Sequence, residues 1–287
     1  MTPKLPDISV IQTNVKTALA EDLGSGDGSG DVSASLINNH QLSATIIVRE
    51  AAVICGQRWA EEVFQQLSDQ VEIQWHINEA EQVNADTLIC SLTGPAHALL
   101  SGERCALNFL QTLSGTATAT RQLVNELSGT NTQLLDTRKT IPGLRLAQKY
   151  AVTCGGGVNH RLGLYDAYLI KENHILAAGG IAKAVSHART KNPTLLLEVE
   201  VENLNELQQA IQAKVDRVLL DNFSLDDLKT AVKTTQGQLQ LEASGGIENG
   251  QLKKIAATGV DYISVGAITK HLKATDFSMR FKETSSD

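Results

Sequence analysis

The spacing of hydrophobic residues in the first third of the chain predicts helices and strands in irregular succession. In residues 9–22 the apolar side chains recur along one helical stripe, and residues 57–67 show a similar helical pattern. β-Branched and aromatic residues between turn-forming residues predict three strands, at 42–49, 71–77 and 87–93. Strands that do not alternate regularly with helices are typical of an α+β arrangement.

A long helix is predicted over residues 101–128, where leucines and other apolar residues keep helical spacing. Ser101 carries a hydroxyl that can cap the start of this helix, and Gly129 is a suitable helix stop. Gly115 lies in the middle of the run and predicts a break or kink, because glycine is a poor helix former. The Gly/Ser/Asp-rich residues 24–31 predict a loop whose role the sequence leaves open.

Beyond residue 130 the pattern becomes regular, because short apolar strands end in a polar residue or glycine and a helical stretch follows each. Six such strands are predicted, at residues 134–136, 167–170, 195–201, 217–220, 239–243 and 260–265. Their ends recur every 21 to 32 residues, which leaves room for the helical crossover that parallel neighbours need. The prediction is an α/β fold with a parallel βα barrel, of which six or seven strands are clear, fewer than the eight of a complete barrel. A doubly wound open sheet is the alternative.

Basic residues are concentrated around the first two of these strands. They are Arg138, Lys139, Arg145, Lys149, Arg161 and Lys171. The only acid between them is Asp166, so six positive charges and one negative charge leave a local balance of +5 in a chain of net charge −7. Arg138, Lys139 and Lys171 follow strand ends, which in a parallel barrel lie on the face that holds the active site. This pattern suits a ligand with several negative charges, and a solvated surface patch is the simpler alternative.

Two acids, Glu200 and Asp221, occupy the next two strand ends. They could be counter-ions for Lys139 and Lys171, ligands of Mg²⁺ directly or through water, or partners of sugar hydroxyls. Glu198 lies two residues before Glu200 and shares its face of the strand, so it is expected to line the same interior.

Glycine-rich segments follow the last two strands. Residues 244–246 (Ser-Gly-Gly) and 266–267 (Gly-Ala) let backbone N–H groups approach a phosphate closely, and late barrel loops are frequent phosphate sites. The string around Ser244 is not the G-x-S-x-G of a serine hydrolase, and no G-x-x-x-x-G-K-S/T phosphate loop occurs.

Composition argues against several classes of protein. A net charge of −7 argues against binding to nucleic acid, no run of 18 apolar residues predicts a membrane span, and no secretory signal is recognisable at the N-terminus. His160 and His174 lack the spacing of a zinc site, although His160, next to Arg161, is a candidate ligand contact. Four scattered cysteines without a CxxC pair suit reduced thiols in a cytoplasmic protein: Cys55, Cys90, Cys105 and Cys154.

Eight strings carry a resemblance to a known family: EDLG (21–24), GERCALNFLQTLSG (102–115), DTRKTIPGLR (136–145), KYAVTCGGGVNHRLGLYDAYLIKENHI (149–175), LEVEVEN (197–203), LLDN (219–222), EASGGI (242–247) and YISVGAIT (262–269). On these strings the chain resembles the quinolinate phosphoribosyltransferases. The match runs through nearly the whole chain, and the block from 136 to 175 is its most specific part.

The resemblance implies that phosphoribosyl pyrophosphate and quinolinate give nicotinate mononucleotide, pyrophosphate and CO₂, with Mg²⁺ as cofactor, in de novo NAD biosynthesis. It also implies two domains. Residues 1–115, joined by the tail 271–287, would form an N-terminal α/β sandwich domain, and residues 116–270 an incomplete TIM-like α/β barrel, the catalytic domain. Subunits are expected to pair head to tail as a homodimer, with the partner subunit's Arg104 reaching the barrel pocket.

By position, the resemblance also implies roles for individual residues. The quinolinate contacts are Arg104, Arg138, His160 and Arg161, and Thr137 is a further substrate-binding residue. The catalytic residues are Lys139 and Lys171, between the two substrates, and Glu200 and Asp221, near the ribose and the Mg²⁺–pyrophosphate. The 5′-phosphate contacts are Ser244, Gly245, Gly246, Val265, Gly266 and Ala267.

Three other functions remain open at this point. The chain could be a related phosphoribosyltransferase that uses nicotinate or another anionic ring, including a relative associated with molybdenum transport. It could be a Schiff-base lyase on a similar barrel, with Lys171 as the amine. It could also be an anion-binding protein without catalytic activity.

Overall fold

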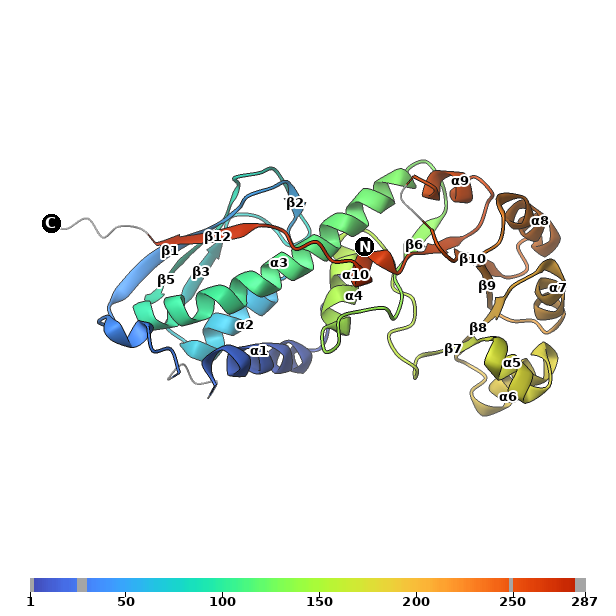
Figure 1. The fold of residues 1–287 in the computed structure, drawn as a ribbon, viewed down its shortest axis with the longest axis horizontal. Coiled ribbons are helices and arrows are strands. Elements are labelled where there is room, and N and C mark those ends of the chain that lie inside the picture. The colour runs from blue at the N-terminus through green and yellow to red at the C-terminus, as the bar shows by residue number, and fades with distance from the viewer. Residues whose placement is uncertain (1–2, 25–29, 248–249, 282–287) are drawn as a thin grey trace. The chain divides into compact units, whose positions relative to one another are not determined.

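The computed structural model describes residues 3–24, 30–247 and 250–281, and the chain falls into two compact units (Figure 1). The first comprises Met1–Arg121, Thr140–Gly156 and Thr269–Asp287, and the second comprises Gln122–Lys139 and Gly157–Ile268. The predicted loop 24–31 lies partly outside the described residues, since 25–29 are not among them.

A four-stranded antiparallel sheet in the order β12-β1-β5-β3 is the base of the first unit. Its strands are β1 (Gln41–Val48), β3 (Glu72–Trp75), β5 (Leu88–Pro95) and β12 (Phe277–Phe281). The three predicted strands are confirmed. Near the other end of the chain, β12 pairs with β1 so that Met279 lies opposite Ile46. A separate two-stranded sheet consists of β2 (Ala52–Val53) and β4 (Gln82–Val83).

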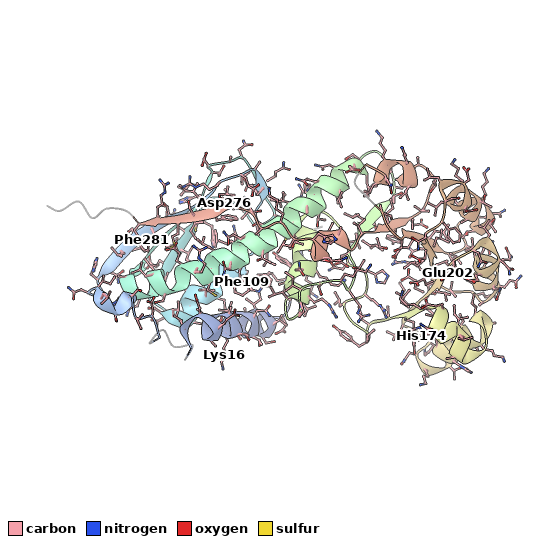
Figure 2. All side chains as sticks on the ribbon, viewed as in Figure 1. Lys16, Phe109, His174, Glu202, Asp276 and Phe281 are labelled. Carbon is pink, nitrogen blue, oxygen red and sulfur yellow. The ribbon has the colours of Figure 1, made fainter. Side chains whose placement is uncertain are left out.

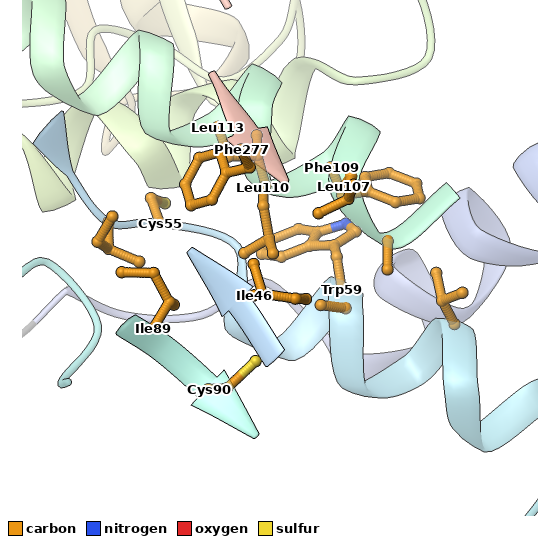
Figure 3. Packing of buried hydrophobic residues seen from close by; sticks show 14 of the residues in the cluster. Ile46, Cys55, Trp59, Ile89, Cys90, Leu107, Phe109, Leu110, Leu113 and Phe277 are labelled. Atoms are coloured by element: carbon orange, nitrogen blue, oxygen red, sulfur yellow. The ribbon is translucent and has the colours of Figure 1, made fainter. Parts of the chain in front are cut away.

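The helical elements of the first unit are α1 (Ile8–Leu23), η1 (Ala34–Leu36), α2 (Gln57–Leu67), the larger part of α3 (Ala96–Glu126) and α4 (Arg145–Cys154). Both short helices predicted here, at 9–22 and 57–67, are confirmed. Apolar side chains from these helices and the sheet form one buried cluster, in which Trp59 of α2 lies near Ile46 of β1 and Leu110 of α3 (Figure 3). Full burial of a large apolar side chain stabilises a fold by roughly 1.5–3 kcal/mol, so this cluster is the main stabilising feature of the unit.

The long helix α3 differs from its prediction in two respects. It begins at Ala96, so Ser101 is not a cap but lies buried within the helix, where its hydroxyl donates to Asp31 Oδ2 at 2.8 Å. It also continues through Gly115 without a break. A Cβ atom at Gly115 would lie 2.2 Å from the carbonyl oxygen of Lys273, so glycine is needed here for close packing rather than for a kink. Although α3 has 31 residues, no helix in the described part of the chain is apolar enough to cross a membrane.

Six parallel strands form the sheet of the second unit, and all six were predicted. They are β6 (Gln133–Leu135), β7 (Ala167–Ile170), β8 (Leu196–Val201), β9 (Arg217–Asp221), β10 (Gln240–Ser244) and β11 (Tyr262–Ser264). Their order is β6-β11-β10-β9-β8-β7, so five strands follow in sequence and the first pairs with the last. A doubly wound sheet would reverse direction in mid-sheet, which this order does not.

The second unit is therefore an incomplete barrel. Within the described residues β6 and β7 are not paired, and on the β6 side the only further parallel bridge joins Leu135 to Val158. Helices in the second unit follow the strands as predicted: α5 (Glu172–Ala178), α6 (Ile181–Lys191), α7 (Leu204–Gln212), α8 (Leu225–Thr235) and α9 (Leu252–Ala256), with α10 (Ala267–Lys270) at the return to the first unit. Helices α5 to α9 cover the outer face of the sheet (Figure 1).

Alternation along the strands separates an apolar outer face from a polar inner face. In β8, Leu197 and Val199 are fully buried in the layer of the helices, while Glu198 and Glu200 share the opposite face. In β10 the acid Glu242 takes the equivalent inner position. The barrel interior thus holds buried acids next to leucines, since Leu169 pairs in register with Glu198 and Leu219 with Glu200 and Glu242.

Gly115→Ala is expected to lower the free energy of unfolding by about 1–3 kcal/mol, because the added methyl group would overlap the backbone at Lys273. In an unhindered helix the same change stabilises by about 1 kcal/mol, so the sign of the effect tests the close approach. Urea unfolding followed by circular dichroism measures it. Asn108→Ala, on an exposed position of α3, is the control. A Gly115→Ala protein as stable as the unaltered chain would contradict this packing.

Candidate active site

Polar side chains gather where the six parallel strands of the second unit end. Thr137, Arg138 and Lys139 follow β6, Lys171 follows β7, and Glu200 lies near the end of β8. The remaining strand ends carry Asp221 and Ser244, as the last residues of β9 and β10, and Val265 and Gly266, directly after β11. Figure 2 shows the side chains on the ribbon, with His174 and Glu202 labelled just beyond β7 and β8. Because parallel strands end at one edge of a sheet, residues far apart in sequence share that edge.

Two arginines, Arg138 and Arg161, lie close enough to influence each other. Burial lowers the pKa of the Arg161 guanidinium, and the positive charge of Arg138 lowers it further. Within the described residues the Nε–H of Arg138 is buried and donates no hydrogen bond. Two like charges and an unpaired buried donor are unfavourable in isolation, so this part of the site is suited to an anion that contacts both side chains.

Lys171 forms an ion pair with Glu200, joining the ends of β7 and β8. The backbone N–H of Lys171 donates to His174 Nδ1 at 3.0 Å, which fixes the start of α5. Lys171 remains about two-fifths exposed while Glu200 is largely covered. The pair therefore places an ammonium group on the accessible side of the site.

Lys139 and Thr137 lie against the loop after β11. The N–H of Lys139 donates to Thr137 Oγ1 at 3.1 Å. A Cβ atom at Gly266 would lie 2.9 Å from Lys139 Cδ and 3.3 Å from Thr137 Oγ1. The absence of a side chain at Gly266 therefore lets the Lys139 side chain lie close to the backbone after β11.

The loops after β9 and β10 interlock through Asn222. Asn222 has a left-handed backbone (φ 56°), its N–H donates to the Ser244 carbonyl at 2.9 Å, and its side-chain amide donates to Asp221 Oδ2 at 2.8 Å. Gly245 has φ 102°, and a Cβ there would lie 2.1 Å from Asn222 Oδ1. Only glycine fits this position, so the acid at the end of β9 and the glycine loop after β10 are fixed relative to each other.

The glycine loops provide backbone donors. In the part of the chain that the structure describes, the N–H groups of Gly245, Gly246 and Gly266 donate no hydrogen bond. Val265 differs, because its N–H donates to the Leu135 carbonyl at 3.0 Å and its side chain is buried. Val265 was expected to contact a phosphate through its backbone. Its N–H already donates to a carbonyl of β6, unlike the N–H groups of the three glycines. Ala267, the first residue of α10, is exposed.

His160 lies buried among acids of the barrel interior. Its Nε2 is 2.7 Å from Glu198 Oε2 and 3.4 Å from Glu242 Oε2. Its Nδ1 accepts the backbone N–H of Arg161 at 2.8 Å, and its own N–H donates to Asp136 Oδ1 at 2.9 Å. Both ring nitrogens are therefore engaged by the protein.

The sequence suggested Glu198 as an interior residue but missed Glu242. Burial raises the pKa of Glu198 to about 7 and that of Glu242 to about 8, and the neighbouring Glu198 charge adds to the shift at Glu242. Arg217 Nη1 lies 3.8 Å from Glu242 Oε2, and its guanidinium stacks over Tyr262 at 4.1 Å. The signal for Glu242 was its position two residues before Ser244, which places both on the inner face of β10.

Two groups of potential metal ligands occur among the described residues. Donor atoms of His160, Glu198 and Glu242 lie within 4.8 Å of one another, as do those of Cys55, Glu79 and Cys154 in the first unit. Glu200 and Asp221 belong to neither group. They offer two carboxylates at neighbouring strand ends, a donor set suited to Mg²⁺ that also binds substrate oxygens and water.

Two models of one protein family match successive parts of this chain. A family model described as "Quinolinate phosphoribosyl transferase, N-terminal domain" matches residues 31–114, and one described as "Quinolinate phosphoribosyl transferase, C-terminal domain" matches residues 116–280. The chain belongs to the quinolinate phosphoribosyl transferase family. The two matches together cover most of the chain, including every strand end described above.

Named relatives of this family are similar to the chain over nearly their whole length. A probable carboxylating nicotinate-nucleotide pyrophosphorylase of Synechocystis is 42% identical over 280 residues, which is 96% of this chain and 94% of the relative. The Bacillus subtilis protein of the same name is 41% identical over 260 residues, 90% of this chain and 89% of the relative. The structure of the nicotinate-nucleotide pyrophosphorylase from Francisella tularensis has 51% sequence identity, a TM-score of 0.93 and 98% coverage of both chains.

One residue to which the family resemblance assigned a role lies outside the second unit. Arg104 is on α3 in the first unit, where its side chain is exposed.

Cys55, Cys90, Cys105 and Cys154 are free and buried. Burial raises the pKa of Cys90 and of Cys105 to about 12, so these thiols are protonated at neutral pH.

The buried carboxyl of Glu242 makes the stability of this family member depend on pH. Its pKa is raised to about 8 in the folded chain, so between about pH 4.5 and 8 the folded state binds more protons than the unfolded state. Stability from this group is present below pH 4.5 and is lost as pH rises through 8. Glu242→Gln is expected to flatten the fall by up to about 1.4 kcal/mol per pH unit.

Denaturant unfolding at pH 5, 6, 7 and 8 measures this slope for Glu242→Gln and the unaltered chain. Glu202→Gln, which changes an exposed acid just after β8, is the matched control and should keep the original slope. Identical slopes in all three proteins would show that Glu242 is ionised in the folded state.

Proposed function

We propose that this chain transfers the phosphoribosyl group of phosphoribosyl pyrophosphate to quinolinate, with decarboxylation, to give nicotinate mononucleotide, pyrophosphate and CO₂. The reaction is a step of de novo NAD biosynthesis. The observation that carries the proposal is the neighbouring pair Arg138 and Arg161, with the unpaired Nε–H of Arg138, near the strand ends of an incomplete barrel. Relatives at 41–42% identity are named probable carboxylating nicotinate-nucleotide pyrophosphorylases, and a Nicotiana tabacum relative at 34% identity is named a decarboxylating quinolinate phosphoribosyltransferase.

Quinolinate suits the arginine pair because it is a pyridine with two adjacent carboxylates. Arginine offers a planar fork of donors that matches a carboxylate, and two forks can take one carboxylate each. We assign Arg138 and Arg161 to quinolinate, together with Thr137 and His160, which directly precede the two arginines in the sequence. Fixing the ring so that its nitrogen faces the ribose can contribute roughly 7–11 kcal/mol to lowering the barrier.

The glycine loops are assigned to the 5′-phosphate of the ribose. Gly245, Gly246 and Gly266 offer N–H groups that donate to no other acceptor among the described residues, and Ser244 adds a hydroxyl. Ala267 follows on the same loop. Val265 is assigned a packing role beneath it, since its N–H is bonded to the sheet.

The charged residues at the remaining strand ends are assigned to the reaction centre. Glu200 and Asp221 would hold Mg²⁺, directly or through water. When bound, the ion would supply positive charge that stabilises the departing pyrophosphate. Lys139 and Lys171 lie at strand ends where they can contact either substrate. The pairing of Lys171 with Glu200 also supports the counter-ion role considered from the sequence.

The chemistry then proceeds without a protein nucleophile. The pyridine nitrogen attacks the anomeric carbon of the ribose as the pyrophosphate oxygen leaves, through a transition state with oxocarbenium character. The ring nitrogen becomes cationic and withdraws electrons, so the adjacent carboxylate leaves as CO₂. Fixed positive side chains, Lys139 and Lys171 among them, stabilise the carbanion that forms before it takes a proton.

We further propose a homodimer in which the partner subunit's Arg104 contacts quinolinate, together with a cytoplasmic location. The exposed side chain of Arg104 on α3 supports the first part, since it is accessible to a second copy. Four free, buried cysteines support the second, because disulfides are rare in a reducing compartment. The ion pair of Lys171 argues against the Schiff-base lyase, since imine formation needs a neutral amine.

The central test is to mix the purified chain with quinolinate, phosphoribosyl pyrophosphate and Mg²⁺. Nicotinate mononucleotide, pyrophosphate and CO₂ are expected in equal amounts, measured by chromatography and by release of label from the 2-carboxylate. Nicotinate in place of quinolinate is the control, because a nicotinate-using relative would form the same mononucleotide without CO₂. Equal turnover of both acids, or none of quinolinate, would overturn the proposal.

Lys139→Ala and Lys171→Ala are each expected to reduce kcat by at least about 100-fold, because each removes a positive charge from the reaction centre. Their circular dichroism and unfolding midpoints should match the unaltered chain. Lys233→Ala, on an exposed position of α8, is the control for loss of one positive charge. Normal turnover in both strand-end variants would exclude these lysines from catalysis.

A further inference from the structure

His160 is enclosed by protein contacts on both ring nitrogens. The residue is 8% exposed. Its Nδ1 accepts the N–H of Arg161 at 2.8 Å, so Nδ1 carries no proton in this arrangement. The proton of a neutral ring is then on Nε2, which donates to Glu198 Oε2 at 2.7 Å. The ring thus links a barrel acid to the backbone of Arg161.

Glu198 is itself fixed in the barrel interior. It lies in the middle of β8, is fully buried, and pairs in register with Arg217 of the neighbouring strand. Behind it, Glu242 of β10 lies 3.4 Å from His160 Nε2 and 3.8 Å from Arg217 Nη1. The Arg217 guanidinium is in turn held over the Tyr262 ring. A continuous polar chain therefore runs from the strands to His160.

The same segment is tied to the loop that carries Arg138. Asp136, which is fully buried, accepts the N–H of His160 at 2.9 Å, and its own N–H donates to the Val158 carbonyl at 3.2 Å. Asp136 stands two residues before Arg138. The backbones of the two arginine-bearing segments are thus bonded to each other, although the two guanidinium groups repel.

The burial of Glu198 and Glu242 calls for an explanation other than packing. A buried carboxylate costs several kcal/mol unless it is paired and hydrogen-bonded, and apolar residues of similar volume are often as stable or more stable. Glu198 Oε1 has no hydrogen-bond partner in the described part of the chain. The other oxygen, Glu198 Oε2, lies 2.7 Å from His160 Nε2.

We propose that Glu198, with Glu242 behind it, is a positioning residue that holds the His160 ring so that Nδ1 fixes the backbone of Arg161 and aims its guanidinium at the substrate carboxylate. The inference rests on the proposed function, and it assigns His160 to act through Arg161. Groups that hold a ligand-binding side chain in place commonly change affinity by about 10–100-fold when removed.

The test compares Glu198→Leu with Glu198→Gln in the full chain. The glutamine oxygen can still accept the Nε2 proton, whereas leucine keeps the volume and removes the acceptor. Glu198→Leu is expected to raise the Kd for quinolinate about tenfold, measured by calorimetry, with the KM for phosphoribosyl pyrophosphate changed less than twofold. Glu198→Gln should stay within about threefold of the unaltered chain, and thermal unfolding confirms that each variant is folded.

A double-mutant cycle with Arg161→Ala shows whether the effect passes through that arginine. The loss from Glu198→Leu should disappear in the Arg161→Ala background, because there is no guanidinium left to aim. Additive losses, or a folded Glu198→Leu protein with normal quinolinate affinity, overturn the inference. If Glu198→Leu does not fold, His160→Phe replaces it, since it keeps a ring but removes Nδ1, and the same outcomes decide.

A direct measurement separates this inference from the proposed function. Nitrogen NMR of histidine-labelled protein, with His160→Phe to assign the signal, should show the neutral Nε2–H form in the unaltered chain and in Glu198→Gln. A proton on Nδ1 overturns the inference whether or not the chain turns over quinolinate. Failure to bind quinolinate with the expected tautomer present overturns the proposed function instead, and leaves the support of Arg161 by His160 confirmed.

Discussion

Repulsion between two guanidinium groups is the constraint on which the site depends. The positive charge of Arg138 adds to the lowering of the Arg161 pKa by burial, and neither side chain can hold the other in place. Their positions are fixed through the backbone instead, by Asp136 and by the ring of His160. Two like charges held close together are stabilised when an anion contacts both, which is why the proposed site suits a doubly charged acid.

The barrel supplies the rigidity that this arrangement needs. Apolar residues such as Leu197 and Val199 bind the sheet to its helices, while the inner positions of the same strands carry acids and Arg217. Buried charges are costly unless they lie near a partner, and here Glu198 and Glu242 lie 2.7 and 3.4 Å from His160, while Glu242 lies 3.8 Å from Arg217. The residues that pack the sheet against its helices and the charged residues of the interior thus lie on opposite faces of one sheet.

The first unit meets a different constraint, which is close packing of a long helix. Buried residues around Trp59 join α2 and α3 to the sheet, and the segment at Lys273 reaches α3 only because Gly115 has no side chain. The same helix presents Arg104 at the surface. Because α3 continues through Gly115 without a break, Arg104 and the packing site at Gly115 belong to one continuous helix.

By itself the sequence determined the periodic features: the helices at 9–22 and 57–67, the six strands of the barrel and the polar residues at their ends, because strand and helix spacing is local. Tertiary structure alone decided the rest. That Glu242 lies beside His160, 82 positions earlier in the chain, depends on the order in which the strands pair. Contact with Lys273 makes Gly115 a packing residue and not a kink, and hydrogen bonding to Leu135 engages the Val265 amide. Such contacts join distant segments, and no local pattern encodes them.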